Sequence, residues 1–511
     1  MAPKLSFGIL MSLALALPCA IEARTETGSA PIAVANVRSP ASPLLKFGTF
    51  KRPFAANSPW NVMPINPVLD DYTLPKTAYF PFFGTGPYTT GVFEAKSGDA
   101  AAVVRGLTNP DGLWNTDESV FKEVTIPRWP ANVLPASGTD GHADIVDPQT
   151  GIVHSFWQLR RVDDGWRATQ YAWTALNGRG WSDPAHNHQG ARAAGVPTMA
   201  GLIRQHELDD GDSLFRHVVA ITLDGSALRK GYVFPATAED DNAAQNYRGG
   251  VPMGSLLMLP ANFDTTRLQT PSLRKLAETL KRYGGAVVDQ NHDTRFTVPV
   301  EQGARFDLHA GGWNSAAGDD LNTIADALRR VVSVDGWLDG NGKKTSLSRN
   351  LNLLSMRGPW TDSPGGARAR FDSWKQLLRF EPRADAVSSE QIVGKSQRMT
   401  AWAPWQPGQT YSFSVQAQGG AQLRLQFRQP DSQVIWETPN LGNGQRIDFA
   451  MPSATGLPLL VATSGIGQPS WVRGRLIAKN VSTQDVSTQA QACPVESESC
   501  RTAASNRKPK R

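Results

Sequence analysis

Hydrophobic and polar residues follow two different patterns along this chain of 511 residues. Between about 120 and 310, short apolar runs are separated by clusters of Gly, Asp, Asn and Pro, which is typical of β-strands joined by turns. From about 386 to 480, apolar and polar residues alternate, as in 411–416 and 422–427. A period of two predicts strands with one buried face. We therefore expect a main β-rich domain at 49–385 and a smaller C-terminal β-sandwich at 386–480.

Helical spacing is clear in only two segments of the main domain. In 271–283, Leu273, Leu276 and Leu280 fall on one stripe, and two glycines follow. The second segment is 319–332, with acidic residues at its start. The predicted fold class is mainly β: an antiparallel β-sandwich or jelly-roll-like main domain with a few peripheral helices, plus the C-terminal sandwich.

Both ends of the chain read as segments outside the folded domains. Lys4, the apolar run 7–17 and a small residue at Ala20 or Ala23 predict a signal peptide at 1–23, followed by a linker at 24–48. The apolar run is too short for a membrane span, so we expect a secreted or periplasmic protein without stable membrane insertion. Residues 481–511 predict a disordered basic tail.

The formal net charge of +6 is modest, and much of the excess lies in that tail. No aromatic residues are interleaved with the basic residues of the tail, as single-stranded nucleic acid would require. We therefore expect no nucleic-acid partner. The sequence does not predict an oligomeric state.

All eight histidines lie between His142 and His309, and this window also holds several acids. Because histidine exchanges protons near neutral pH, the window is where we expect chemistry. Asp140, His142 and Asp144 share a face if their segment is a strand, so His142 and Asp144 are candidate catalytic residues. The alternative is a polar turn around Asp147-Pro148.

Glu207 is the only glutamate between Glu123 and Glu239, and it follows an apolar segment. Partial burial there predicts a raised pKa suited to a general acid. The neighbouring Arg204 and His206 are candidate substrate-binding residues. His217, on the apolar face of the next predicted strand, fits a core histidine better than a catalytic one.

A further set of polar residues follows the predicted helix at 271–283. Tyr283 precedes two glycines, and a short apolar strand then ends at Asp289, with His292 three residues later. Strand ends that carry such groups are frequent functional sites, so Tyr283 and Asp289 are candidate catalytic residues and His292 a candidate substrate-binding residue. An Asp/Asn turn after a buried strand is the alternative.

The pair His186 and His188 has the spacing that points two imidazoles the same way on a strand. No third ligand is specified nearby, so we expect no cofactor, and a divalent metal has only weak support. A metal-dependent hydrolase built on this pair stays open as an alternative.

The main domain also resembles a widespread family of secreted bacterial β-rich proteins. The resemblance lies in a glycine-flanked apolar segment at 195–204, then Glu207, His217, Pro-Met-Gly at 252–254 and a late Tyr-Gly with Asp at 283–289. It covers roughly residues 55–310 and leaves out the C-terminal sandwich. It implies a shared architecture and no mechanism.

Fifteen tryptophans, several of them near turns, indicate aromatic surfaces that stack on sugars, and Trp60 and Trp181 are candidate substrate-binding residues. The leading hypothesis is an exported enzyme that cleaves a polysaccharide. Hydrolysis would use Glu207 as the acid, with Asp144 or Asp289 as its partner. Elimination would use His142 or His217 with Tyr283 and Arg204. A non-catalytic glycan-binding or matrix protein is the alternative from a different class.

Overall fold

The computed structural model describes residues 46–84, 86–108, 112–115, 119–163, 165–183, 188–306, 308, 315–347, 352–354, 356, 358–362, 370–373, 377–392, 408–429, 431–452 and 456–479. The expected signal peptide, most of the expected linker and the expected basic tail lie outside these residues, as does His186.

The largest sheet has seven strands. In spatial order these are β2 (Val68–Leu69), β20 (Arg329–Ser333), β17 (Leu256–Met258), β18 (Gly285–Asn291), β14 (Val219–Asp224), β19 (Phe296–Pro299) and β3 (Phe82–Gly84). The central strands β14 and β18 run parallel, whereas β17 pairs antiparallel with β18 and β19 pairs antiparallel with β14. The sheet is therefore mixed, where an antiparallel main domain was predicted.

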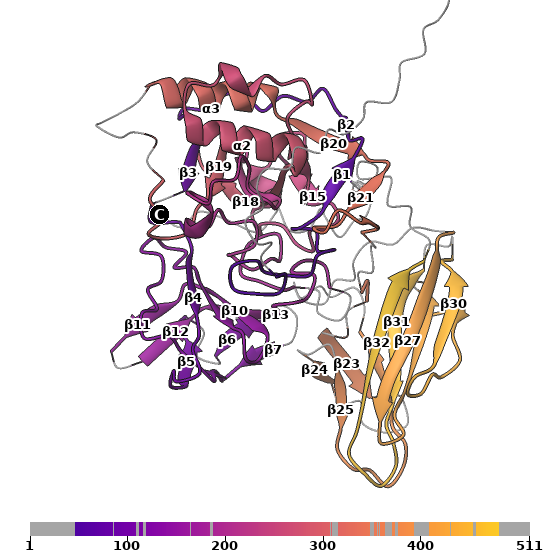
Figure 1. The fold of residues 1–511 in the computed structure, drawn as a ribbon. Helices are drawn as coiled ribbons and strands as arrows, with labels where there is room; N and C mark the ends of the chain where they lie inside the picture. Colours follow the sequence, from indigo (N-terminus) through magenta and orange to yellow (C-terminus); the bar gives the residue numbers. More distant parts are fainter. Residues whose placement is uncertain are drawn as a thin grey trace, which may run out of the picture. The chain divides into compact units, whose positions relative to one another are not determined.

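Helices α2 (Pro271–Arg282) and α3 (Ser315–Ala327) pack against each other, and Figure 1 shows them over the strands of this sheet. The apolar stripe of α2 is buried, including Leu273, Leu276 and Leu280. Helix α2 is the last element of the long connection from β14 to β18, which also includes β17 and allows β18 to run parallel to β14.

The predicted second helix ends earlier than residue 332. Helix α3 stops at Ala327, and the next residues form β20, which pairs with both β17 and β2. As β20, this segment forms backbone hydrogen bonds with strands on both sides, in place of the helical hydrogen bonds that its apolar stripe predicted. Tertiary structure therefore decided its conformation.

Two smaller sheets share a second core. One has the order β4 (Gly91–Glu94), β9 (Ala143–Asp147), β10 (Ile152–Trp157), β13 (Gln170–Ala175), β6 (Leu113–Asn115) and β7 (Ser119–Phe121). The other has the order β11 (Arg160–Val162), β12 (Gly165–Ala168), β5 (Ala102–Gly106) and β8 (Glu123–Ile126). Val104 and Ile126 of the second sheet are in one hydrophobic cluster with Ile145 and Phe156 of the first, as in a sandwich.

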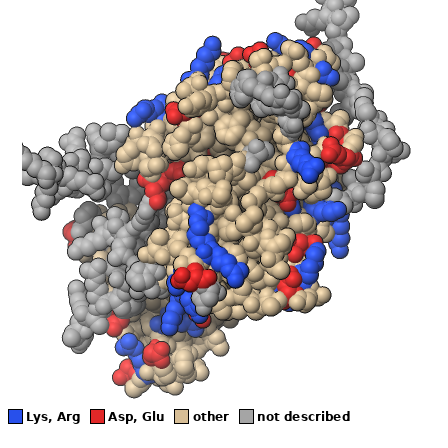
Figure 2. All heavy atoms as spheres, turned by 90° about the vertical axis from the view of Figure 1, so that its left-hand side faces the viewer, with Lys and Arg blue, Asp and Glu red and all other residues tan. Residues whose placement is uncertain are grey.

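Short elements complete the N-terminal part of the described chain. They are β1 (Met63–Ile65), β21 (Gly336–Leu338) and β22 (Lys344–Thr345) in one sheet, β15 (Leu228–Tyr232) and β16 (Val251–Met253) in another, and the helical turns η1 (Gln205–Glu207), α1 (Ala243–Asn246) and η2 (Thr265–Arg267). Figure 2 shows one face of the molecule, on which acidic and basic side chains are interspersed among broad uncharged areas.

The C-terminal part forms a sandwich of two antiparallel sheets around its own core (Figure 1). The six-stranded sheet has the order β24 (Arg370–Ser373), β23 (Gly358–Asp362), β26 (Ser388–Gln391), β31 (Leu457–Thr463), β28 (Gln422–Arg428) and β29 (Val434–Glu437). The four-stranded sheet has the order β25 (Leu378–Phe380), β32 (Ser470–Ala478), β27 (Thr410–Gln418) and β30 (Arg446–Ala450). The sheets thus include strands that precede residue 386.

The described structure is mainly β, as the sequence predicted, and its sheets are partly antiparallel and partly mixed. No helix in the described ranges is long and apolar enough to cross a membrane.

Truncation of the α2 stripe should test how far the large sheet depends on this helix. Leu276 is completely buried, so Leu276→Ala should lower the free energy of unfolding by about 2–5 kcal/mol through lost burial and a cavity. The same change at Leu134, which is 62% exposed, should cost less than about 0.5 kcal/mol. Urea denaturation of both variants measures the difference, and equal shifts would contradict the packing described.

Candidate functional site

Arg192 lies at the centre of a group of ionisable side chains, although its own side chain is only 3% exposed. One terminal amino group donates to Asp289 Oδ2 at 3.4 Å. The other donates to the Thr198 carbonyl oxygen at 3.3 Å and to Thr90 Oγ1 at 3.4 Å. A buried cation is stable only with such partners. We call this group the acid–arginine site; it comprises Asp140, His142, Asp144, Arg192, Asp240, Tyr247 and Asp289.

A tight turn holds Arg192 against the large sheet. The backbone N–H of Gly195 donates to the Arg192 carbonyl at 2.8 Å, and that of Ala194 donates to the Val288 carbonyl of β18 at 3.1 Å. Gly195 has a φ of +79°, and a Cβ at this position would lie 2.2 Å from Thr237 Oγ1. Only glycine fits this turn, which therefore fixes the Arg192 backbone beside β18.

A β-bulge in β18 sets the position of Asp289. Val287 pairs with Ile221, but the next pair is Asp289 with Thr222, so Val288 is an extra residue. Bulges redirect the side chains that follow them and are frequent beside functional sites. Residues 285–288 are buried, and from Asp289 onward the strand becomes partly exposed.

Near physiological pH, the carboxyl group of Asp289 is present in both its protonated and its ionised form. Burial and the neighbouring charges of Asp240 and Asp140 raise its pKa to about 7, although Arg192 acts in the opposite direction. Its side chain retains 21% exposure, so it can reach a solute. An acid with this pKa is suited to give or take a proton at neutral pH.

Asp240 is the second carboxyl group of the site. Burial raises its pKa, and the charge of Asp140 adds to this effect. The hydroxyl of Tyr247 donates a hydrogen bond to Asp240 Oδ2, which stabilises the carboxylate form of Asp240. When one proton is shared between the two carboxyl groups, this hydrogen bond favours Asp240 as the ionised member and Asp289 as the protonated one.

Asp144 is completely buried and braces the loop that carries Arg192. It accepts hydrogen bonds from Thr198 Oγ1 at 2.6 Å and from the backbone N–H of Met199 at 2.7 Å. Burial raises its pKa to about 6, although these hydrogen bonds and the charge of Arg192 lower it. Both carboxylate oxygens thus accept hydrogen bonds within the protein, so Asp144 supports the loop that carries Arg192.

His142 is buried beside this network. Burial, and then the charges of Arg192 and Arg160, hold its pKa well below the usual value. Its Nδ1 is buried and has no hydrogen-bond partner among the described residues. A neutral histidine next to a buried cation is a poor proton reservoir, so we assign the acid chemistry to the aspartates.

Glu207 belongs to a separate group, and its predicted raised pKa is wrong. Burial acts to raise the pKa, but the charge of His217 at 3.2 Å and hydrogen bonds from His217 and the Arg204 backbone lower it overall. The pKa of His217 is raised in turn: burial lowers it, but the charge of Glu207 together with hydrogen bonds to Glu207 and to the Val218 backbone outweighs that effect. Asp144 and Asp289, the partners predicted for Glu207, are not among the groups that shift its pKa most, and Glu207 is not among those that shift theirs.

The residues predicted to bind substrate around Glu207 have structural partners. Arg204 is buried and pairs with Glu301 at 3.1 Å, and it also donates to the Phe50 carbonyl at 3.1 Å. His206 Nε2 lies 3.1 Å from the Lys51 carbonyl oxygen, and burial lowers its pKa. Tyr283, which was predicted to be catalytic, is buried at the end of α2, and burial raises its pKa. The contacts of Arg204 and His206 fasten the segment around residue 50 to the turn at η1 and to Glu301, two residues after β19.

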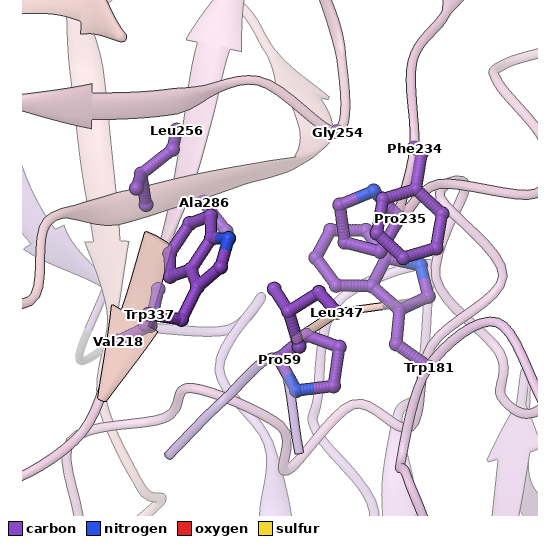
Figure 3. A pocket seen from close by; sticks show the side chains of 10 residues that line it. All are labelled: Pro59, Trp181, Val218, Phe234, Pro235, Gly254, Leu256, Ala286, Trp337 and Leu347. Atoms are coloured by element: carbon purple, nitrogen blue, oxygen red, sulfur yellow. The ribbon is translucent and has the colours of Figure 1, made fainter. Parts of the chain in front are cut away.

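Trp60 and Trp181 are buried, at 2% and 1% exposure, and their rings stack on each other at 4.9 Å. As buried rings they have no free face for a sugar, which corrects the predicted stacking role. Trp181 instead lines an apolar pocket with Phe234, Pro235 and Trp337 (Figure 3). All ten lining residues are apolar, so this pocket offers no group for proton transfer.

Three residues of the acid–arginine site were not singled out by the sequence: Arg192, Asp240 and Tyr247. Arg192 lies in a Gly/Ala-rich stretch without periodicity, and Asp240 is in an acidic run at 239–241 that resembles an ordinary solvated loop. The glycines around Arg192 were the available signal, since they mark a constrained turn. His292, which was predicted, is exposed and acts electrostatically on Asp240.

No group of three or more His, Cys, Asp or Glu side chains in the described segments is arranged to hold a metal ion. Of the histidine pair proposed for metal binding, His186 lies outside those segments.

The Glu207–His217 pair should make stability depend on pH. The raised pKa of His217 gives stabilisation that is complete below about pH 6.5 and is lost as the pH rises through the raised value. The lowered pKa of Glu207 gives stabilisation that is complete above about pH 4.3 and is lost as the pH falls through the lowered value. Glu207→Gln should therefore lower the melting temperature most between about pH 4.5 and 6.5, by the equivalent of about 3 kcal/mol.

Glu123→Gln is the matched control, because Glu123 forms an ion pair with Arg105 in which both side chains are about half exposed. Its effect should stay below about 1 kcal/mol at every pH. A Glu207→Gln effect that persists undiminished at pH 9 would show that the ion pair is not its cause.

Comparison with known proteins identifies no relative. Neither a protein family nor a curated protein matches this sequence. Among solved structures, accessory secretory protein 1, 2 and 3 of Streptococcus pneumoniae matches 20% of this chain and 86% of its own, at 10% identity and a TM-score of 0.14. The enzymatically active domain of bacteriophage CBA120 tailspike protein 4 matches 25% of this chain and 21% of its own, at 11% identity and a TM-score of 0.17. A CBM4 structure matches 23% of this chain and 88% of its own, at 10% identity and a TM-score of 0.14. Similarity at this level supports no conclusion about activity.

Proposed function

We propose that this protein is an exported enzyme that hydrolyses a glycosidic bond of a polysaccharide at the acid–arginine site. The observation that carries the proposal is the pair Asp289 and Asp240, in which the pKa of Asp289 is raised to about 7. Glycoside hydrolysis needs two carboxyl groups beside the scissile bond, one protonated and one ionised.

In the proposed reaction, Asp289 donates its proton to the oxygen that leaves the sugar. As the bond to that oxygen breaks, positive charge develops on the sugar ring, and the Asp240 carboxylate stabilises it. Water supplies the hydroxyl group that completes the new sugar end, and its remaining proton restores Asp289. The overall change is addition of one water across the glycosidic bond.

Arg192 and Tyr247 tune this pair. The charge of Arg192 acts to lower the pKa of Asp289, so that burial and the neighbouring acids do not raise it further. The hydrogen bond from Tyr247 favours the ionised form of Asp240, against the burial that raises its pKa. Opposed influences on two carboxyl groups are typical of sites that run acid and base chemistry together.

Two exposed tyrosines lie next to the loops that carry the site. Tyr88 is 58% exposed, and its ring packs against Gly138, two residues before Asp140. Tyr79 is 67% exposed, and its backbone N–H donates to the Asp293 carbonyl, one residue after His292. Exposed aromatic rings beside a polar site suit stacking on sugar faces, which supports a glycan as the substrate.

Asp289→Asn should abolish turnover while the fold is kept, because the amide cannot donate the proton. We expect a loss of about 10²- to 10⁴-fold in the rate at which reducing ends appear from a panel of neutral, acidic and amino-sugar polysaccharides. Asp293→Asn is the matched control, since Asp293 is exposed nearby and asparagine tolerates its positive φ of 58°.

Ultraviolet absorbance is followed in the same assay. Reducing ends that appear together with new absorbance would indicate that the bond is cleaved by elimination and not by hydrolysis. Retention on a glycan with neither signal would favour the non-catalytic binding protein. Either result, or an active Asp289→Asn variant, would refute the proposal.

The pH profile should respond to Arg192. Because Asp289 must be protonated, the rate should fall as the pH rises through about 7. Arg192→Gln removes a charge that lowers the pKa of Asp289, so the alkaline limb should move to higher pH, whereas Arg192→Lys should shift it less. Initial rates between pH 5 and 9 measure this, with circular dichroism to confirm folding. A limb that moves downward in Arg192→Gln would contradict the role assigned to Arg192.

A further inference from the structure

One face of the C-terminal sandwich carries a row of hydrogen-bond donors. Along β32 the buried residues alternate with Trp471 and Arg473, and along β27 with Gln416 and Gln418. The register places Gln418 opposite Trp471, and Gln416 opposite Arg473. These four side chains therefore lie together on the outward face of the four-stranded sheet.

The flanking strands extend this surface. Arg379 of β25 lies opposite Trp471, and Arg446 of β30 lies opposite Ser414, two residues from Gln416 on β27. Both arginines are exposed. We call this surface the arginine–tryptophan face; it consists of Arg379, Gln416, Gln418, Arg446, Trp471 and Arg473. Arg475, on the same side of β32, is half-buried and is left out of it.

Internal hydrogen bonds on this face occupy its acceptors and leave donors. The indole Nε1 of Trp471 donates to Gln418 Oε1 at 2.7 Å, and Nε of Arg473 donates to Gln416 Oε1 at 2.7 Å. Within the described residues, the NH₂ groups of both glutamines and the terminal amino groups of Arg473 stay available for an external acceptor. The carboxylate on the outward positions of these strands is Asp448, which is paired with Lys479.

We infer that the arginine–tryptophan face binds an anionic polysaccharide, whose sugars carry carboxylate or sulfate groups. Three exposed arginines complement the negative groups, and the fork of each guanidinium matches a carboxylate or sulfate. The partly exposed ring of Trp471 offers a surface for a sugar ring, and the two amides donate to hydroxyl oxygens. Single-stranded nucleic acid would call for several aromatic rings in succession, whereas Trp471 is the one ring on the outward positions of the described strands of this sheet.

This inference goes beyond the proposed hydrolysis and does not rest on it, because it involves a different sheet and a different set of residues. The binding inference and the proposed hydrolysis can therefore be disproved independently of each other. Binding is therefore measured with the full chain carrying Asp289→Asn, so that turnover of a ligand does not disturb the measurement.

The experiment is affinity electrophoresis at pH 7 in gels that contain polygalacturonate, a sulfated galactan or neutral dextran. Both anionic polysaccharides, or one of them, should retard the full chain, and dextran should not. Trp471→Ala keeps the charge and should weaken retardation at least tenfold, as should the double change Arg379→Gln with Arg473→Gln. The charge-matched control is Lys343→Gln with Lys344→Gln, two exposed lysines outside the sandwich, which should change it less than twofold.

Three results would overturn the inference. The first is absence of retardation by either anionic polysaccharide. The second is equal weakening by the face variants and the lysine control, which would indicate attraction by net charge alone. The third is tighter binding of oligo-thymidylate than of either polysaccharide with the same dependence on Trp471, which would make the face a nucleic-acid surface. Thermal melting of each variant confirms that the sandwich is folded.

Discussion

A chain of hydrogen bonds through the buried guanidinium of Arg192 joins two sheets of the N-terminal part. Asp144 on β9 accepts from Thr198 and Met199, the Thr198 carbonyl accepts from Arg192, and Arg192 reaches Asp289 on β18. Asp144, Thr198 and Arg192 are buried and Asp289 is partly exposed, so loss of one member would leave a buried polar group without its partner. The position of the acid on the large sheet therefore depends on a carboxylate in the neighbouring sheet.

The pKa values of carboxyl groups shift in opposite directions in the two ionisable groups: that of Glu207 is lowered, and those of Asp289 and Asp240 are raised. Glu207 and His217 lie close enough to stabilise each other's charged forms, so the pair acts as a brace. Asp289 and Asp240 lie near other acids, so each disfavours the charged form of its neighbour. Environment, and not residue type, decides which carboxyl group can exchange a proton near neutral pH.

The sequence allowed a partial prediction of this structure. Alternation located β27, β28, β29, β30 and β32 of the C-terminal sandwich. It did not locate β23, β24, β25 and β26, nor β31, whose continuous apolar run lies between two neighbouring strands and lacks the period of two. Asp144, His142 and Asp289 were named in advance because strand ends and Asp/His spacing leave a local signal. Asp240 leaves no such signal and Arg192 only the glycines of its turn, because the importance of both arises from burial and from neighbours distant in the chain. Glu207 was assigned the wrong ionisation because its partner His217 was expected in the core.

The extra residue in β18 has a consequence for how this protein can change over time. Up to Val287 the residues of β18 are buried in the hydrophobic core, where each side chain must fill a fixed volume between the sheet and its neighbours. From Asp289 onward the side chains are partly exposed and are not constrained by the core in this way. Val288 shifts the pairing register between the buried part of the strand and the part that begins at Asp289. Substitutions after Val288 can therefore change the ionisable side chains without repacking the core, and small changes in the core need not move Asp289. The bulge thus divides one strand into a buried part, fixed by the core, and a partly exposed part that carries the ionisable side chain.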